Sequence, residues 1–585
     1  MIKSFSLSRG KAMINFSSKY CKTEAEVLES DAFKCVIKKY FERIDKEYTK
    51  SKLLMHSVVK SENIDEIVEK TVIMFKLLTT MTSKEISENF DRFSFLYENK
   101  ERFNEMLEDI YTYWRNLERY AIVFENNTSE GLDRKSFIAT KKDFDDLILD
   151  LYRKISINLL LETPSVYRQV SAGTNAGLVL KKVVWPVPEG YESLKRIPFI
   201  VNMVLETPFI TYPKKNTRSG FFEEEKTNPI IDAIIDQDAF LCYPIWVGDL
   251  LCFAYCHRDF ITHLVSLSNL FEPAKVNEVA GRKPDIMIIF SYIDQRGAND
   301  KYYVDDKNDM IVGYVSYDER YDYFGYMKKM ILTIHNIKQI KRGNLPIHGS
   351  MIKLELNDSS KANIVIMGDS GAGKSESIEA LRSLSKEYLS DMTIIFDDMG
   401  NFRINPANNK LLAYGTETGA FVRLDDLDEG YAFKQLDRSI FMNPDKINAR
   451  LISPVSSYEE IMNGEKVDIF LYANNYDEVK ENEKSIIRFK NEEEAKKVFI
   501  AGKRQAKGTT SEKGLTTSFF ANPFGPYQEQ ELSNILIDKY FKELFDRDIF
   551  VGQIKTQLGI VGKEKDGPKE AAIELFDLIK KLNRN

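Results

Sequence analysis

The stretch Asn363-Ile-Val-Ile-Met-Gly-Asp-Ser-Gly-Ala-Gly-Lys374-Ser375 decides the fold class of this chain. An apolar strand expected over 363–367 runs directly into a glycine-rich loop. Glycines in that loop permit backbone conformations that a Cβ would hinder, so several N–H groups can turn inward toward phosphate oxygens. A helix expected over 376–389 adds its positive N-terminal end. Strand, loop and helix in this order predict a P-loop that binds nucleotide phosphates.

Each loop residue has an expected role. Lys374 would reach the β and γ phosphates, while the Ser375 hydroxyl would bind the Mg²⁺ that accompanies ATP. A further strand expected over 392–396 ends in Asp397-Asp398, where a carboxylate can hold the same metal. A glycine-rich packing turn and an acidic surface turn are the structural alternatives. The candidate nucleotide-binding residues are Gly368, Asp369, Ser370, Gly371, Ala372, Gly373, Lys374, Ser375 and Glu376.

The chain of 585 residues is longer than one hydrophobic core usually supports, which predicts more than one domain. Apolar residues recur at helical spacing in residues 1–160, for example Ile64, Ile67 and Val68, so this region is expected to be helical. Short apolar runs broken by Pro and Gly predict a mixed α/β, substrate-side domain over 161–344. Residues 345–585 would form the nucleotide domain. The predicted fold class is α/β, with the site in the cleft between the last two domains.

The amino-acid composition limits the classes of partner that the protein is expected to bind. The 43% hydrophobic and 29% charged residues are typical of a folded, water-soluble protein, and the net charge of -7 argues against broad nucleic-acid binding. With no long apolar run and no signal-peptide pattern, we expect a cytoplasmic protein without a membrane partner. Five scattered cysteines predict reduced thiols. Cys252, Cys256 and His257 lack a second ligand pair, so they are expected to be structural and not a metal site.

Further segments resemble the ATP-type phosphoenolpyruvate carboxykinases. Tyr323-Phe-Gly-Tyr-Met-Lys328-Lys329, nineteen residues before His348 in Leu-Pro-Ile-His-Gly-Ser, is similar to that family's Tyr-Ala-Gly-Glu-Met-Lys-Lys and Met-His-Cys-Ser segments at the same separation. The similarity spans roughly residues 280 to 580. Later segments resemble, in order, the family's remaining active-site and lid segments: Glu417 to Arg423, Asn448-Ala-Arg450, Phe499 to Lys503 through Thr517-Ser-Phe-Phe, and Gly562-Lys563.

The resemblance implies a carboxykinase-like fold and an ATP-dependent conversion of oxaloacetate to phosphoenolpyruvate and CO2. It implies that Lys329, His348 and Asp398 bind a second divalent metal, Mn²⁺, whose ligation needs a neutral lysine. Solvated cations, a core histidine and surface salt bridges are the alternatives. The remaining roles implied are Arg450 as phosphoryl clamp beside Arg423, Lys328 and Tyr323 facing substrate, and Arg218 binding the substrate carboxylate.

Several departures keep other functions open. The acidic turn Asp397-Asp398-Met-Gly-Asn lacks the family's following Glu-His pair, the Arg218 segment matches only in part, and residues 1–160 have no counterpart. The loop sequence itself is closer to HPr kinase. A kinase acting on another small molecule or a protein serine is therefore one alternative, and a nucleotide-binding regulatory protein without turnover is another. The substrate class expected is a small molecule.

A basic, glycine-containing stretch over 503–518 is expected to be a mobile lid above the nucleotide. Phosphate-seeking cations alternate there with flexible glycines, an arrangement suited to a closure that excludes water. An exposed basic loop is the alternative. The residues concerned are Lys503, Arg504, Lys507, Lys513, Gly502, Gly508 and Gly514.

Overall fold

The computed structural model forms two compact units, an N-terminal unit of Met1–Lys181 with Ile200–Glu206 and a C-terminal unit of Lys182–Phe199 with Thr207–Asn585. The partition into three domains stays a prediction, because the nucleotide sheet and the preceding α/β region belong to one unit here. None of the described helices is both long and apolar enough to cross a bilayer. The structure describes residues 4–17, 20–46, 63–124, 132–162, 172–217, 221–295, 300–369, 371–424, 436–506 and 514–584.

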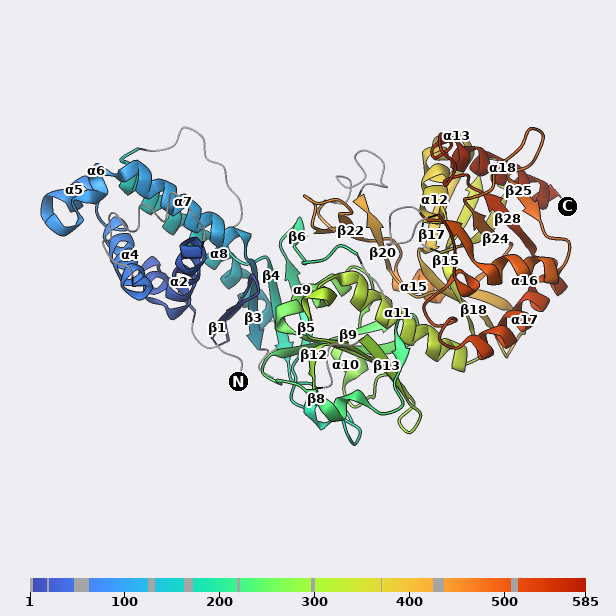
Figure 1. Ribbon diagram of the computed structural model, residues 1–585, viewed down its shortest axis with the longest axis horizontal. Coiled ribbons are helices and arrows are strands. Elements are labelled where there is room, and N and C mark those ends of the chain that lie inside the picture. Colours follow the sequence, from blue (N-terminus) through green and yellow to red (C-terminus); the bar gives the residue numbers. More distant parts are fainter. Residues whose placement is uncertain are drawn as a thin grey trace. The chain divides into compact units, whose positions relative to one another are not determined.

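The N-terminal unit is helical over most of its length (Figure 1). Its helices bury one apolar face each, as in α4 (Ile64–Leu78), where Ile67, Val68 and Phe75 are buried. The helical periodicity did not indicate the strands, which pair in the order β1 (Phe5–Ser8), β2 (Lys11–Asn15), β3 (Glu118–Phe124), β4 (Ala176–Lys181), β5 (Phe199–Leu205). The other helices are α1 (Glu24–Glu29), α2 (Asp31–Lys46), α5 (Ser83–Asn89), α6 (Phe95–Glu98), α7 (Lys100–Asn116) and α8 (Leu132–Leu160).

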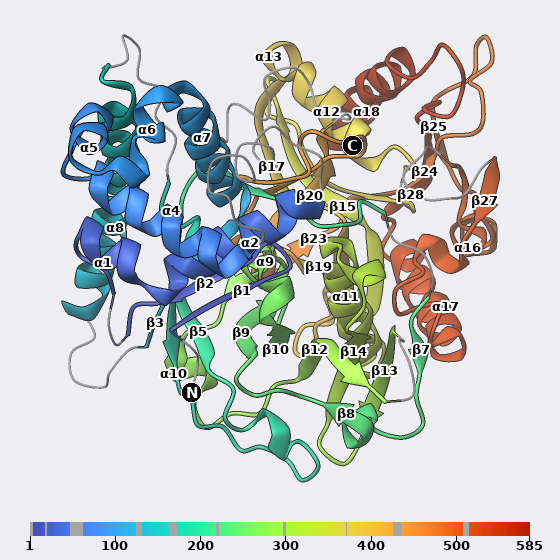
Figure 2. The ribbon, with the colours of Figure 1, turned by 60° about the vertical axis from the view of Figure 1, so that its left-hand side comes forward.

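In the first sheet of the C-terminal unit, helix α11 (Phe324–Lys341) packs against strands β12 (Ile286–Asp294) and β14 (Met310–Ser316) (Figure 2). Contact is close because Gly313 faces the helix: a Cβ there would lie 2.5 Å from the Met330 Cγ. All cysteines of this unit are buried free thiols on or beside this sheet, as expected. The strand order is β9 (Phe240–Val247), β10 (Leu250–His257), β12 (Ile286–Asp294), β14 (Met310–Ser316), β13 (Asp300–Asp305), β7 (Glu223–Glu224).

The second sheet holds the predicted phosphate loop and has a helix layer on each face (Figure 1). Alternate residues of β16 (Lys361–Met367) point to opposite faces: Ile364 and Ile366 pack with α12 (Lys374–Ser383) and α18 (Asp566–Arg584). Val365 and Met367 pack with α16 (Glu492–Ala501) and α17 (Gln530–Asp546). Burial on both faces explains the continuous apolar run of this strand.

This sheet has the order β23 (Glu465–Lys466), β19 (Leu411–Gly415), β18 (Met399–Ile404), β15 (Leu345–Leu356), β16, β24 (Ile469–Asn474), β28 (Phe550–Lys555), β25 (Ile486–Arg488). Strand β17 (Leu389–Phe396) pairs with β15 off this path. The predicted helix 376–389 is wrong at both ends: α12 starts at Lys374 and ends at Ser383, and Leu389 belongs to β17. A second short helix, α13 (Ser385–Tyr388), separates them, because the chain must turn to enter β17.

Candidate active site

Strand β15 places the phosphate loop and the acidic turn on the two sides of His348. The Gly368 N–H donates to the His348 carbonyl at 3.0 Å, and the Gly349 N–H donates to the Asp398 carbonyl at 3.1 Å. Residue 349 must be small, because a Cβ there would lie 2.6 Å from the Ile366 carbonyl oxygen. The segment His348-Gly-Ser350 is therefore the backbone junction at which both predicted motifs meet.

The loop has the backbone geometry expected of a phosphate cradle. Gly371 and Gly373 adopt φ of 80° and 102°, in the left-handed region that favours glycine. Gly373 also precedes α12, whose first N–H groups lack intrahelical acceptors. The Lys374 Nζ donates to the Gly368 carbonyl at 2.6 Å, so this buried ammonium lies within the loop. Ala372 is buried and Glu376 partly exposed, while Ser370 and the side chain of Ser375 lie outside the described residues.

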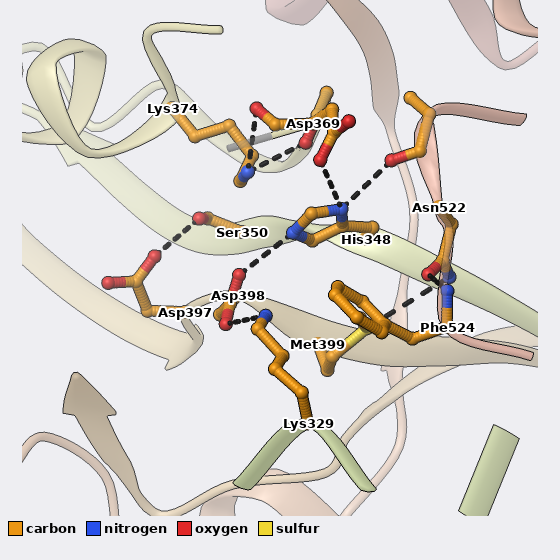
Figure 3. A network of polar contacts seen from close by, with 12 residues as sticks. Lys329, His348, Ser350, Asp369, Lys374, Asp397, Asp398, Met399, Asn522 and Phe524 are labelled. Carbon is orange, nitrogen blue, oxygen red and sulfur yellow. Dashed lines mark hydrogen bonds and ion pairs between the residues drawn. The ribbon is translucent and has the colours of Figure 1, made fainter. Parts of the chain in front are cut away.

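Asp398 is the centre of the site (Figure 3). Its Oδ2 lies 2.7 Å from the Lys328 Nζ and 2.9 Å from the Lys329 Nζ, and its Oδ1 lies 2.9 Å from the His348 Nε2. Burial opposes ionisation of Asp398, but the two lysines and His348 together hold its pKa well below the usual range. Its φ of 86° is uncommon for a residue with a Cβ, a deviation that the converging cations help to maintain.

The paired lysines differ in their partners and therefore in the direction of their pKa shifts. Lys328 lies between two carboxylates, with its Nζ also 2.9 Å from the Glu417 Oε1. Burial opposes its charge, but Asp398 and Glu417 raise its pKa. Burial lowers the pKa of Lys329, and Asp398 offsets that effect only in part. Of the two lysines, Lys329 is thus the one whose charged form is disfavoured, which is the direction that metal ligation needs.

The hydrogen bonds of His348 fit a divalent cation beside Asp398. The Nδ1 lies 2.8 Å from the Ala521 carbonyl, which can only accept, so Nδ1 carries the proton. Burial, the largest cause, lowers the pKa of His348, which makes the ring neutral. Its Nε2 then presents a lone pair to the ionised Asp398. Two acceptors facing each other at 2.9 Å favour a cation bound by both.

A metal at this place requires Lys329 as its third protein ligand. Within the described ranges, no group of three or more His, Cys, Asp or Glu side chains is arranged to hold a metal ion. Asp397, the other expected carboxylate, accepts a hydrogen bond from the Ser350 Oγ at 2.6 Å. Ser350 was not a candidate from the sequence, and only its place two residues after His348 on one strand face could have indicated it.

The expected arginines lie on a small sheet of β20 (Gly419–Arg423), β22 (Arg450–Pro454), β21 (Ile440–Met442) and β6 (Phe209–Thr211). Arg423 and Arg450 are directly opposite each other in the β20–β22 register. The Arg450 Cζ lies 5.4 Å and the Lys328 Nζ 5.6 Å from the centroid of the Phe421 ring. Among described residues, the buried Arg450 Nε has no hydrogen-bond partner. A bound anion would supply one.

Two further candidates have different outcomes. Tyr323 precedes α11 and is buried, with its ring centroid 6.1 Å from that of Phe421. It therefore lies beside the aromatic ring that Arg450 and Lys328 approach. Arg218 belongs to residues 218–220, outside the described residues, so its role remains a prediction.

Glu417 was quoted only as the first residue of a similar segment, yet the structure buries it completely next to Lys328. Burial raises its pKa to about 7, an effect that the attraction of Lys328 only partly opposes. A carboxylate before a strand usually indicates a solvated turn. Its burial depends on the packing of β20 against α11, which the sequence does not reveal.

Glu417→Gln is expected to flatten the dependence of stability on pH. Between about pH 4.5 and 7 the native state keeps this proton and the unfolded state releases it, so the free energy of unfolding of the parent falls as pH rises. The slope is about 1.4 kcal/mol per pH unit at most. Urea denaturation across this range measures it, with the exposed Glu459→Gln as control. Parallel curves for parent and Glu417→Gln would contradict the assignment.

The predicted lid is a hairpin whose ends are anchored. β26 (Lys503–Gln505) pairs antiparallel with β27 (Leu515–Thr517), and Arg504 is 3% exposed, so it is a buried residue and not a solvent-facing cation. Gly502 is the C-cap of α16, where a Cβ would lie 1.9 Å from the Ser518 carbonyl. Gly514 has φ of 77°. Lys507, Gly508 and Lys513 lie outside the described residues, so a mobile tip remains a prediction.

The site therefore contains the predicted phosphate loop and acidic turn, with Lys328, Lys329 and His348 converging on Asp398 from segments far apart in the sequence. No protein-family model and no curated protein matches the chain.

Proposed function

We propose that the C-terminal unit is an ATP-dependent carboxykinase-like enzyme of the cytoplasm that converts oxaloacetate and ATP to phosphoenolpyruvate, CO2 and ADP. The observation that supports this best is the convergence of Lys329, His348 and Asp398 beside the phosphate loop. In the reaction, the bond from C3 to the departing carboxylate breaks and leaves its electron pair in an enolate. The enolate oxygen then takes the γ-phosphoryl group, and the bond from that phosphorus to the β-phosphate oxygen breaks.

The residues of the site suit a reaction that accumulates negative charge. Lys374 holds the β and γ phosphates, and Asp397 and Ser375 are placed in the motif to hold Mg²⁺. His348, Asp398 and neutral Lys329 would bind Mn²⁺, which when bound supplies Lewis-acid stabilisation of the enolate oxygen. Lys328 keeps its charge because two carboxylates flank it.

Arg450 is the proposed phosphoryl clamp. The proximity of both the Arg450 guanidinium and the Lys328 ammonium to the Phe421 ring supports this role. Arg423, opposite it on the neighbouring strand, adds positive charge. Tyr323 also lies beside the Phe421 ring and would face substrate.

Product analysis with oxaloacetate tests the proposal. Purified protein with ATP, Mg²⁺ and Mn²⁺ is expected to release CO2 and form phosphoenolpyruvate and ADP in equal amounts, and only when oxaloacetate is present. ADP formation with other metabolites or a protein serine, but not with oxaloacetate, would favour a kinase of similar fold. Tight ATP binding without any turnover would favour a regulatory nucleotide-binding protein. Either result would overturn the carboxykinase proposal.

A further inference from the structure

Asp369 places a carboxylate inside the phosphate loop, where negative charge opposes the ligand. It is 5% exposed and lies beside Arg504 and Ser518. Its Oδ2 lies 3.1 Å from the Arg504 Nε and 2.8 Å from the Ser518 Oγ. Its Oδ1 also lies 3.6 Å from the His348 Nδ1. The structure thus places Arg504, Ser518 and His348 around this carboxylate.

The hairpin that supplies Arg504 is fixed to the loop at the next residue as well. The fully buried Asn475 donates from Nδ2 to the Gly371 carbonyl at 2.9 Å and to the Gln505 carbonyl at 3.0 Å. Its Oδ1 accepts from the Gln505 N–H at 2.8 Å. Of two consecutive residues of β26, Arg504 therefore pairs with Asp369 directly, and Gln505 is linked to Gly371 through Asn475.

The end of the same hairpin leads to the metal-ligand candidate. Just after Ser518, Phe520 and Ala521 have φ of 51° and 45°, and both are fully buried. Left-handed conformations at non-glycine residues persist only where surrounding contacts impose them. Here the Ala521 carbonyl accepts the hydrogen bond of the His348 Nδ1. The contacts that order Asp369 and those that orient His348 thus come from one short segment.

We propose that Arg504 is a positioning residue for ATP that acts through Asp369. Its guanidinium cancels the charge of the loop carboxylate and holds the loop open to phosphate, without itself touching the nucleotide. The inference rests on the nucleotide site of the proposed function. This role for Arg504 would also make the paired strands β26 and β27 part of the nucleotide site.

A double-mutant cycle separates this role from direct phosphate binding. Arg504→Gln leaves the buried carboxylate of Asp369 without its arginine partner, so the affinity for Mg²⁺-ATP is expected to fall about 10- to 100-fold. Asp369→Asn alone should change it by less than about threefold. In the double variant the repulsive charge is gone, so affinity should return to within about fivefold of the parent. Titration calorimetry with Mg²⁺-ATP measures all four proteins.

Three controls separate an effect on ATP binding from a general loss of the fold. The first control is Arg403→Gln, which breaks another arginine-aspartate pair of the same unit. The Arg403 Nη2 lies 2.8 Å from the Asp249 Oδ1, and loss of this pair should leave ATP affinity unchanged. Thermal unfolding without ATP reports the fold of each variant. If Arg504→Gln does not fold, Arg504→Lys replaces it in the cycle, alone and combined with Asp369→Asn. Because Arg504→Lys keeps the positive charge, this variant alone should bind ATP like the parent.

Equal weakness of Arg504→Gln and of the double variant would overturn the inference, because it would show that Arg504 binds phosphate directly. Tighter ATP binding by Asp369→Asn than by the parent would overturn it too, since the ion pair would then not cancel the loop charge. A parent that does not bind ATP would refute the nucleotide site itself and the role of Arg504 with it. A parent that binds ATP but does not turn over oxaloacetate would refute only the proposed reaction.

Discussion

Lys374→Ala is expected to weaken Mg²⁺-ATP binding by at least about 100-fold, because the loop loses its buried ammonium and with it a charge-assisted contact to the β and γ phosphates. The Nζ is already inside the loop, 2.6 Å from the Gly368 carbonyl, and needs only a small movement to reach a phosphate oxygen. Titration calorimetry with Mg²⁺-ATP measures the loss directly, independent of the substrate.

Lys353→Ala is the matched control for this variant. Lys353 belongs to β15 of the same unit, but its Nζ pairs with the Glu465 Oε1 at 2.9 Å and is 42% exposed. Its removal should leave ATP affinity unchanged, as expected of a surface ion pair. An ATP affinity of Lys374→Ala equal to that of the parent would disprove the assignment of the phosphate loop.

His348→Ala is expected to remove the dependence of activity on Mn²⁺ and to lower Mn²⁺ affinity by at least about 10- to 100-fold. The variant loses the Nε2 lone pair that faces Asp398. Of the three proposed metal ligands, only Lys329 and Asp398 are then left. Direct Mn²⁺ titration by electron paramagnetic resonance measures affinity without substrate. Turnover measured against Mn²⁺ at saturating Mg²⁺-ATP reports the functional dependence.

His335→Ala controls for the cavity that a lost buried histidine creates. His335 is fully buried on α11, and burial lowers its pKa to about 4, but its Nδ1 pairs with the Asn336 Oδ1 at 3.0 Å and not with Asp398. It should lose stability while keeping Mn²⁺ affinity. If His348→Ala and the parent share one Mn²⁺ dependence, His348 is a structural core residue.

Local motifs could be predicted because their physical causes are local. The strand 363–367, the glycine-rich loop and the strand before Asp397 depend on apolar runs and on glycine conformations, which neighbouring residues determine. The end of α12 at Ser383 was missed, because helical periodicity continues through a short second helix and gives no sign of the turn into β17.

The grouping of the site depends on tertiary packing. Lys328, His348 and Glu417 come from a helix, a strand and a loop, and no sequence pattern encodes the distances between them. Nearby charges then separate the two neighbouring lysines: Asp398 and Glu417 raise the pKa of Lys328 against the effect of burial, whereas burial lowers the pKa of Lys329. Arg504 is the opposite case: the basic, glycine-containing stretch 503–518 predicted a phosphate-seeking lid cation, and the structure buries Arg504 in an ion pair with Asp369.

The amino-acid sequence by itself predicted the phosphate loop, the acidic turn and the candidate ligands, because glycine torsions, strand hydrophobicity and side-chain chemistry act within a few residues. Only the tertiary structure decided that β15 brings the loop and the turn together at His348, that the pKa of Lys329 is lowered while that of Lys328 is raised, and that Asp369 is paired with Arg504. These outcomes depend on charge, desolvation and hydrogen bonding between segments far apart in the chain, and such contacts exist only once the sheets and helices have packed.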